Sequence, residues 1–578
     1  MLNTLPWSSY TRTVLQQSRL QDCLFLIVVA SLSMSNYICS LGFYSDDWAL
    51  LYSMHFSPDQ SFAGIFTAVN SSQDSEICPI QFLSYASLYK LFALIPLGYH
   101  VLNGIFFMLG LVLLYLILIT LHQPRVLALA TSVIYMLLPN YSTDRFWISV
   151  QANLGMFFAF FGIYAHLRAL RCRKAVFWGW QIFAILCVIA SGLTYEVFLP
   201  LVLVTTVFLF ASELAKDWPL TVAGRAITRA AVRQGVIVIT VILVVLVKMV
   251  WASRAQPTVE MGIISYGYWV IKIVVKSFVY SYGYHLLGLP FTVLHSLRDD
   301  FDWIMVTTAG VIGILIFVRM YTSWGMSSGA VVTSRAKMLM YVACGVIVFV
   351  AGYSIASPNP VKNGINNRIA IAGTLGVAVS VVGLLGMLSS LAPGVWRKVS
   401  FSAAVGVIGM SGSLTIEVLG SLWIQSYRSQ KEYLSDIRSH LPAIPAGTTL
   451  LLDGVCPYSG PAPVFEQPWD LSSALSILYD HPGISANIVT RWLRVEPNGL
   501  ITPFCCGEVK YPFDHLFVYH FGRKISYPLP DADAAQSYFS KISTDRGSRC
   551  PVDFYGNGVE VLGGFGPMLG RNPYAPRR

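Results

Sequence analysis

Residues 98–121 read GYHVLNGIFFMLGLVLLYLILITL, a run without a single Lys, Arg, Asp or Glu. As a helix this run would be about 36 Å long, and the hydrocarbon core of a membrane is about 30 Å thick. Similar apolar runs recur along the 578-residue chain, which is 55% hydrophobic and only 12% charged. Soluble domains carry about 25% charged residues. The sequence therefore predicts an all-α polytopic membrane protein.

The apolar runs predict about eleven transmembrane helices. They lie at about 22–42, 98–121, 124–139, 147–169, 175–192, 196–213, 235–252, 303–320, 338–356, 369–391 and 400–423. A further stretch, 266–294, is interrupted by Lys272 and Lys276 and broken by Pro290. We expect it to be interfacial or re-entrant, with an additional hairpin as the alternative.

Basic residues indicate the orientation. The loops on the same side as Arg12 and Arg19 hold nearly all the Lys and Arg of the short loops, as cytoplasmic loops do. We therefore expect the N-terminus in the cytoplasm and the C-terminus outside, with the chain in a bacterial inner (plasma) membrane. The net charge of +10 then follows from topology and contact with anionic lipid, without nucleic acid as a partner.

Two domains are expected. Residues 1–423 form the transmembrane domain, with long outer loops at 43–97 and 254–302, and residues 424–578 form a small soluble α/β domain in the periplasm. Within the second domain we expect helices at 426–440 and 471–479 and strands at 448–452 and 516–519. Its four cysteines are disulfide candidates, with a zinc site as the alternative; they are Cys456, Cys505, Cys506 and Cys550.

Ionisable residues gather at the outer ends of the predicted helices. Those at or near such ends are Asp46, Asp47, Glu76, Asp144, Arg145, Glu196, Lys248, Arg368 and Glu417. An ion-coupled transporter would place acids near the middle of the membrane. The distribution instead favours chemistry on a lipid-linked substrate at the outer face.

Transfer of a sugar from a polyprenyl phosphate requires a base for the acceptor hydroxyl and cations for the departing phosphate. Asp46 is the candidate base, and the neighbouring Asp47 would raise its proton affinity. Arg145 and Arg368, together with Lys248, are the candidate phosphate ligands. No motif demands a metal or cofactor, although two adjacent acids could hold a divalent ion.

Four local motifs carry a family resemblance. They are the acid pair Asp46-Asp47 after the first helix, Glu76-Ile77-Cys78-Pro79 before the second, and the motifs His100-Val101-Leu102-Asn103 and Thr194-Tyr195-Glu196. In these features the chain resembles the GT-C glycosyltransferases, which include protein O-mannosyltransferases and the aminoarabinose transferases of lipid A. The resemblance implies a GT-C-like fold with Asp46 as catalytic base.

The resemblance also suggests substrate-binding candidates, namely Glu76, Tyr195, Glu196 and His100. A packing role is the alternative for His100, and a structural ion pair between helices is the alternative for Glu196 and Lys248. Many relatives place Lys, Arg or His directly before the proline of the first loop, where this chain has Cys78. Arg145, Lys248 or Arg368 would then have to supply the missing cation.

The predicted function is an inverting glycosyltransferase that moves one sugar from a polyprenyl-phosphate donor to a glycan, lipid or protein acceptor at the outer face. The alternatives are a transporter or flippase for lipid-linked saccharides, and a glycan ligase or polymerase using a diphosphate-linked donor.

Overall fold

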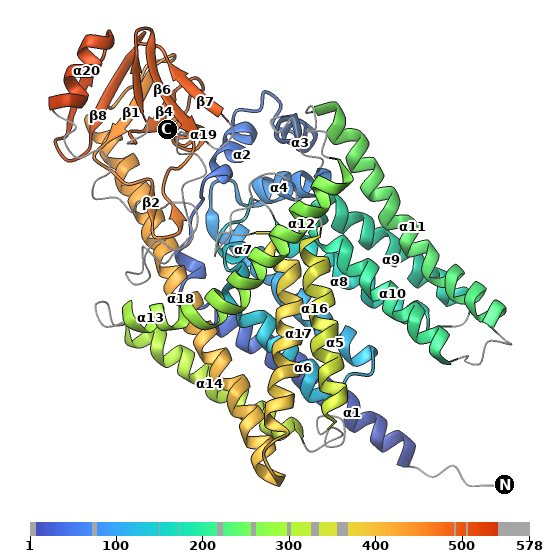
Figure 1. Cartoon of the computed structure of the whole chain (residues 1–578). Helices are drawn as coiled ribbons and strands as arrows, with labels where there is room; N and C mark the ends of the chain where they lie inside the picture. The colour runs from blue at the N-terminus through green and yellow to red at the C-terminus, as the bar shows by residue number, and fades with distance from the viewer. Residues whose placement is uncertain are drawn as a thin grey trace, which may run out of the picture.

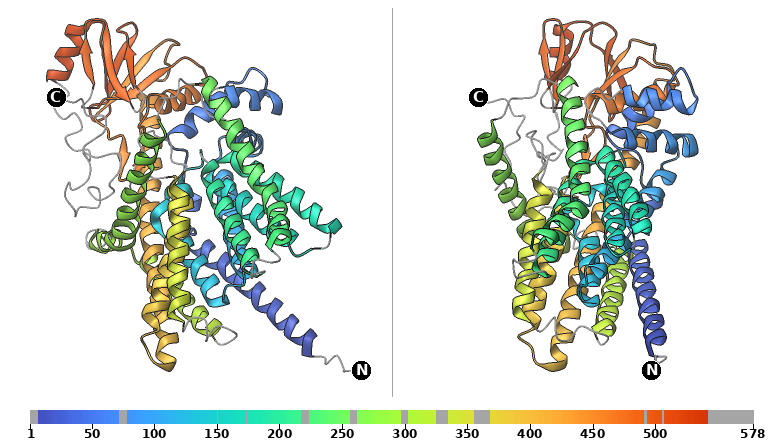
Figure 2. Two further views of the ribbon diagram at one scale, coloured as in Figure 1. Left: turned by 45° about the vertical axis from the view of Figure 1, so that its right-hand side comes forward. Right: turned by 90° about the vertical axis from the view of Figure 1, so that its right-hand side faces the viewer.

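The computed structural model describes residues 7–71, 78–149, 151–172, 174–216, 223–255, 262–296, 302–324, 334–354, 368–490, 493–504 and 507–541. A bundle of helices makes up most of the molecule, and small β-sheets lie at one end of it (Figure 1). The N-terminal helix extends from the opposite end, as two further views confirm (Figure 2).

Each of the eleven apolar runs overlaps a helix. The helices are α1 (Trp7–Leu32), α5 (Pro96–Thr120), α6 (Arg125–Leu137), α8 (Ala152–Ala169), α9 (Lys174–Thr194), α10 (Leu199–Lys216), α11 (Ala223–Ala255), α14 (Trp303–Ser323), α16 (Arg335–Tyr353), α17 (Ala370–Ser389) and α18 (Gly394–His440). Among the described residues, six helices are long and apolar enough to cross a membrane: α5, α9, α14, α16, α17 and α18. The chain is a multi-pass membrane protein, and the number of eleven crossings remains a prediction.

Two helices fall short of their expected spans by five residues or more. Helix α1 ends at Leu32, where the hydroxyls of Ser33 and Ser35 donate hydrogen bonds to nearby backbone carbonyls and compete with further helical turns. Helix α8 begins only at Ala152, because the preceding Gln151 has a left-handed backbone with φ of 49°. Residues 147–149 and 151, expected inside the fourth span, are therefore not helical.

Shorter helices occupy the two long loops. The first loop contains α2 (Asp46–His55), α3 (Phe62–Ser71) and α4 (Pro79–Phe92). The second contains α12 (Ile263–Phe278), the π-helix η5 (Val279–Gly288) and α13 (Leu289–Ser296), which follow one another without a break. This helical run contains no turn, so the alternative of an extra hairpin within 266–294 is wrong. It crosses obliquely over α16 and α17 (Figure 1).

The sheet region follows α18. One sheet has the order β4-β1-β8-β9, in which β1 pairs in parallel with β4 and β8, and β9 is antiparallel to β8. The sheet region also contains the helices α19 (Pro468–Tyr479) and α20 (Ala532–Lys541). The strands are β1 (Thr449–Asp453), β2 (Tyr458–Ser459), β3 (Ala462–Pro463), β4 (Ser485–Ile488), β5 (Arg494–Glu496), β6 (Gly499–Phe504), β7 (Gly507–Tyr511), β8 (Leu516–His520) and β9 (Ile525–Pro528).

Helix α18 connects the two parts of the molecule. It has 47 residues and continues from the last apolar run directly to the base of the sheet region. Helix α19 of the sheet region packs against α2. This contact brings the sheet region next to the acid pair at the start of α2.

Candidate active site

The acid pair begins helix α2 immediately after a strained turn. Ser45 has φ of 48° and ψ of −117°, a backbone conformation that non-glycine residues rarely adopt. Its hydroxyl does not cap the helix but donates a 2.8 Å hydrogen bond to Glu466 of the sheet region. The Glu466 carboxylate also accepts a hydrogen bond from the Tyr458 hydroxyl. The sheet region thus helps to hold the turn that presents Asp46 and Asp47.

Asp47 is fully buried and hydrogen-bonded. Its carboxylate accepts the Tyr44 backbone N–H at 3.0 Å and the Tyr85 hydroxyl at 2.9 Å. Burial raises the pKa of Asp47 to about 8, more than these two donors lower it. Burial therefore favours the protonated form of Asp47, and its contacts hold the turn before α2 against helix α4.

Asp46 has a more open environment. Its side chain is 31% exposed, and one carboxylate oxygen accepts the indole N–H of Trp469 at 3.1 Å. The other oxygen lies 3.6 Å from a guanidinium nitrogen of Arg368. Arg368 in turn stacks on Trp147, with 3.4 Å between the guanidinium carbon and the ring centroid. Asp46 is therefore a partly accessible carboxylate beside a cation, the arrangement required of a general base for a reaction that releases phosphate.

Arg145, the other candidate arginine, is oriented differently. Its guanidinium is buried, donates to the backbone carbonyl of Met136, and lies 3.4 Å from the Ser33 hydroxyl and 4.5 Å from the Phe107 ring centroid. These contacts lie on α6, directly after α1, and on α5. The structure therefore brings Arg368, and not Arg145, next to Asp46.

Lys248 forms an ion pair with Glu196, which is the alternative that the sequence left open for these two residues. Its ammonium lies 2.5 Å from the Glu196 carboxylate, 3.1 Å from the Gly192 carbonyl and 3.8 Å from the Cys78 sulfur. Cys78 precedes α4, and Tyr85 on this helix contacts Asp47 two turns later, about 10 Å along the axis. The ammonium thus lies against the residue before Pro79, the position at which the resemblance predicts a cation.

The remaining sequence candidates have varied positions. The His100 ring nitrogen Nε2 lies 2.8 Å from the Gly42 carbonyl, next to the turn that leads to the acid pair, which fits its packing role. Tyr195 precedes Glu196 at the end of α9. Cys456 is disulfide-bonded. Four candidates, Glu76, Cys505, Cys506 and Cys550, lie outside the described residues, so the cysteine pairing stays a prediction.

Sequence reasoning missed several residues that contact the acid pair, the preceding Ser45 or the Arg368 guanidinium. Tyr85, Trp147, Trp469 and Glu466 come from three separate segments, and the last two are more than 400 positions from Asp46. Only Trp147 had a local signal, because it follows the candidate pair Asp144-Arg145. The others reach the site through tertiary packing.

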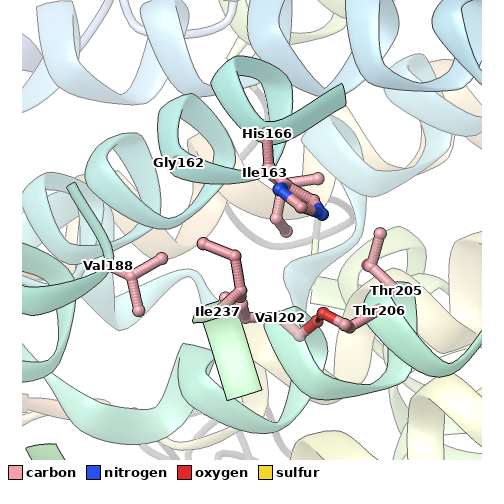
Figure 3. A pocket seen from close by; sticks show the side chains of 8 residues that line it. All are labelled: Gly162, Ile163, His166, Val188, Val202, Thr205, Thr206 and Ile237. Atoms are coloured by element: carbon pink, nitrogen blue, oxygen red, sulfur yellow. Dashed lines mark hydrogen bonds between the residues drawn. The ribbon is translucent and has the colours of Figure 1, made fainter. Parts of the chain in front are cut away.

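A small pocket lies elsewhere in the bundle, between α8, α9, α10 and α11 (Figure 3). Its one ionisable side chain, His166, lies 2.9 Å from the Gln181 amide oxygen and 2.8 Å from that of Gln234. The lining is otherwise mostly apolar, with no acid and no arginine; it consists of Gly162, Ile163, His166, Val188, Val202, Thr205, Thr206 and Ile237. The acid pair therefore remains the candidate for chemistry.

No family model and no curated protein sequence matches the chain. It is similar to two solved structures of ArnT from Cupriavidus metallidurans. For the structure bound to undecaprenyl phosphate, the identity is 14% and the TM-score 0.34, over 81% of this chain and 85% of that chain. For the apo structure the identity is 15% and the TM-score 0.33, over 80% and 84%.

Proposed function

We propose that the chain is an inverting glycosyltransferase of the GT-C type, which moves a single sugar from a polyprenyl-phosphate donor to an acceptor hydroxyl. The observation that carries this proposal is the partly exposed carboxylate of Asp46 with the Arg368 guanidinium beside it, at the junction of the bundle and the sheet region. A base and a cation at one place are what this reaction requires.

In the proposed reaction, Asp46 accepts the proton of the acceptor hydroxyl while the hydroxyl oxygen attacks the anomeric carbon. The bond between that carbon and the phosphate oxygen breaks, and the electron pair leaves with the polyprenyl phosphate. Attack from the face opposite the leaving group inverts the anomeric configuration. Asp47, protonated through burial, positions Asp46 and takes no proton from the acceptor.

Arg368 and Lys248 are the proposed phosphate ligands. Arg368 can offer two parallel N–H donors to phosphate, while Lys248 supplies a point charge. Lys248 contacts Cys78 and would replace the cation that many relatives carry before the first-loop proline. Arg145 is assigned to packing, because its guanidinium already contacts Met136 and Phe107.

The proposed setting is a bacterial inner membrane with the N-terminus in the cytoplasm and the acid pair and sheet region on the periplasmic side. A donor sugar on a polyprenyl phosphate would reach the site from the outer leaflet. The acceptor would approach from the side of the sheet region, which contacts Asp46 through Trp469 and the preceding Ser45 through Glu466.

The test is an assay in membranes with a panel of polyprenyl-phosphate sugars and extracted envelope acceptors. Wild-type protein should release polyprenyl phosphate and give a product of inverted anomeric configuration, while Asp46→Asn should not. We also propose that no divalent metal is needed, so EDTA should leave the rate unchanged. Full transfer by a folded Asp46→Asn variant would refute the mechanism, and movement of donor across the membrane without transfer would favour the flippase alternative.

A further inference from the structure

The connection between α6 and α8 carries buried polar side chains that lack partners. Among the described residues, no hydrogen-bond partner exists for either amide atom of Asn140 and Gln151, for the Trp147 indole nitrogen, or for the Ser149 hydroxyl. All four side chains are at most 8% exposed. Burying a polar group without a partner destabilises a protein, so such groups need a reason.

Two of these four residues, Trp147 and Ser149, are linked to the acid pair independently of each other. The Trp147 ring stacks on Arg368, which faces Asp46. The Ser149 backbone carbonyl accepts a hydrogen bond from the Gln81 side chain. Gln81 lies one turn before Tyr85 on α4, and Tyr85 donates to Asp47.

Comparable amides nearby have partners. The Asn153 amide nitrogen donates to Asn103 at 2.9 Å and to the Asp144 carbonyl at 2.8 Å, and only its amide oxygen lacks a partner among the described residues. The Gln430 amide accepts the Trp48 indole N–H at 3.2 Å and donates to the Val464 carbonyl at 2.9 Å. Amides with neither atom partnered are therefore a property of Asn140 and Gln151, and not of these neighbours.

We propose that Asn140, Trp147, Ser149 and Gln151 bind the sugar that is transferred, and that this sugar is neutral. The inference rests on the proposed function and names the substrate class of the same site. Each sugar hydroxyl both donates and accepts, and amide, hydroxyl and indole groups offer the complementary set. Groups built for such hydrogen bonds discriminate strongly against ligands that leave them unpaired.

Charge supports the neutral assignment. An ammonium or carboxylate on the sugar would need an opposite charge in this buried setting. The two arginines of this part of the molecule are already engaged, because Arg368 faces Asp46 and Arg145 donates to the Met136 carbonyl. The Asp144 carboxyl is also buried in this connection, and burial raises its pKa well above the usual range, which disfavours its charged form.

Two matched pairs of variants test the proposal: Gln151→Met against Gln430→Met, and Asn140→Leu against Asn153→Leu. Removing an unpartnered buried amide should keep or raise thermal stability, whereas removing an engaged one should lower it. Binding is measured with purified full-length protein and two probes, undecaprenyl-phosphate hexose and undecaprenyl phosphate. Gln151→Met and Asn140→Leu should each weaken hexose-lipid binding about 10-fold and leave binding of the sugar-free lipid unchanged.

Three results would overturn the proposal. Gln151→Met could lose as much stability as Gln430→Met, the two variants could bind both lipids as the wild type does, or the wild type could prefer a donor with an amino or carboxyl sugar. If the wild type transfers no sugar yet shows hexose-dependent binding that Gln151→Met loses, the sugar site stands and the proposed transfer fails.

Discussion

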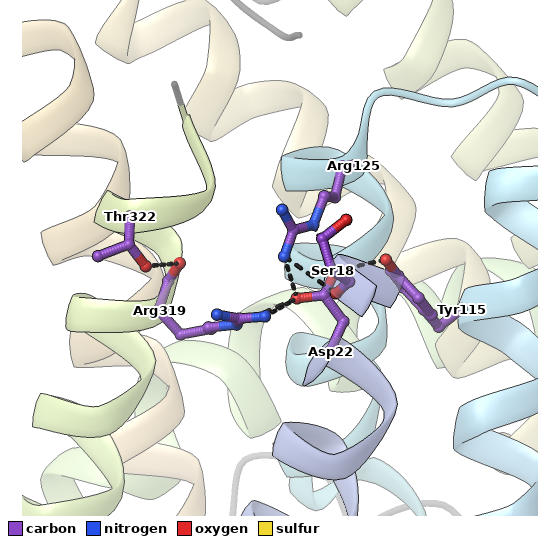
Figure 4. A network of polar contacts seen from close by, with 6 residues as sticks. All are labelled: Ser18, Asp22, Tyr115, Arg125, Arg319 and Thr322. Atoms are coloured by element: carbon purple, nitrogen blue, oxygen red, sulfur yellow. Dashed lines mark hydrogen bonds and ion pairs between the residues drawn. The ribbon is translucent and has the colours of Figure 1, made fainter. Parts of the chain in front are cut away.

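Two carboxylates in the bundle have opposite surroundings. Asp22 on α1 is fully buried and receives the Tyr115 hydroxyl at 2.5 Å, Arg125 nitrogens at 2.5 and 2.9 Å, and Arg319 nitrogens at 2.7 and 3.0 Å (Figure 4). Asp46 at the sheet end is 31% exposed, with one donor at 3.1 Å and one cation at 3.6 Å.

The difference separates a carboxylate that fits a structural role, Asp22, from one that fits the proposed role as a base, Asp46. Asp22 has its lone pairs occupied by donors from α5, α6 and α14, and it ties these helices to α1. A carboxylate in that state has no free position for a substrate proton. Asp46 keeps such a position and sits beside a cation that a phosphate could engage. The presence of a carboxylate alone therefore does not distinguish the two roles. They are distinguished by how many hydrogen-bond donors already occupy the carboxylate oxygens.

The largest effect on transfer is expected for Asp46→Asn. It removes the base, and general base catalysis contributes about 10²- to 10⁴-fold, so transfer should fall about 10³-fold. Thermal stability should change little, because Asp46 is partly exposed and makes long contacts. The measurement is single-turnover transfer alongside thermal unfolding in detergent, with Asp46→Glu as the control that keeps a carboxylate. If Asp46→Asn lost as much thermal stability as an Asp22 variant, Asp46 would also have a structural role, and the distinction between the two carboxylates would be wrong.

Arg368→Lys should lower transfer about 10- to 100-fold, because lysine reproduces neither the stacking on Trp147 nor a two-donor contact with phosphate. The variant should also bind undecaprenyl phosphate more weakly than the wild type, because the lipid phosphate is the proposed ligand of Arg368. Arg145→Lys is the matched control, since its contacts lie in the bundle. It should lower stability and leave binding of the lipid phosphate unchanged. Equal binding losses in both variants would contradict the assignment.

A smaller loss of activity is expected for Asp47→Asn, about 3- to 10-fold, through displacement of Asp46. Its clearer signature is the pH dependence of stability. The folded state holds the Asp47 proton up to pH of about 8, whereas the unfolded chain releases it near the ordinary pKa of 3.8. Wild-type stability should therefore fall as pH rises through this window.

In Asp47→Asn this fall should be weaker, because the asparagine does not titrate. Unfolding midpoints measured from pH 4 to pH 9 in both proteins give the comparison. Parallel curves for the two proteins would mean that Asp47 ionises normally in the folded state.

The smallest effect on transfer, counted per folded molecule, is expected for Asp22→Asn. The variant leaves Arg125 and Arg319 without their shared counter-charge, and breaking a buried ion pair costs about 3–5 kcal/mol of stability. Tyr115→Phe, which removes only one neutral donor from Asp22, should cost about 1 kcal/mol. Chemical unfolding in detergent measures both. If Asp22→Asn were as stable as the wild type, the structural role assigned to Asp22 would be wrong.

The positions of the helices followed from the sequence because a membrane span depends on local composition. Every apolar run, such as 98–121, overlaps a helix. Errors occurred where local interactions end a helix, as at Leu32. The candidate site was harder to predict from the sequence than the helices. The acid pair is contiguous and visible, whereas Trp469 reaches Asp46 from the far end of the chain.

Side-chain direction was the other obstacle. Asp144 and Arg145 are neighbours in the four-residue helix α7 (Thr143–Phe146), yet the Arg145 guanidinium contacts the bundle. No pattern in so short a segment indicates which residue faces the acid pair. Arg368 is similar, because its position beside Asp46 depends on a stack with a tryptophan from another loop.

Helix α18 acts as a rigid spacer between the apolar bundle and the sheet region. Its 47 residues amount to about 70 Å of continuous helix. An inserted residue beyond Trp423 would rotate everything that follows by about 100° and raise it by about 1.5 Å. Trp469 and Glu466 would then no longer align with Asp46 and Ser45. The length of one helix, counted in whole residues, thus sets how the sheet region meets the acid pair, and in the proposed reaction it would set where an acceptor reaches Asp46.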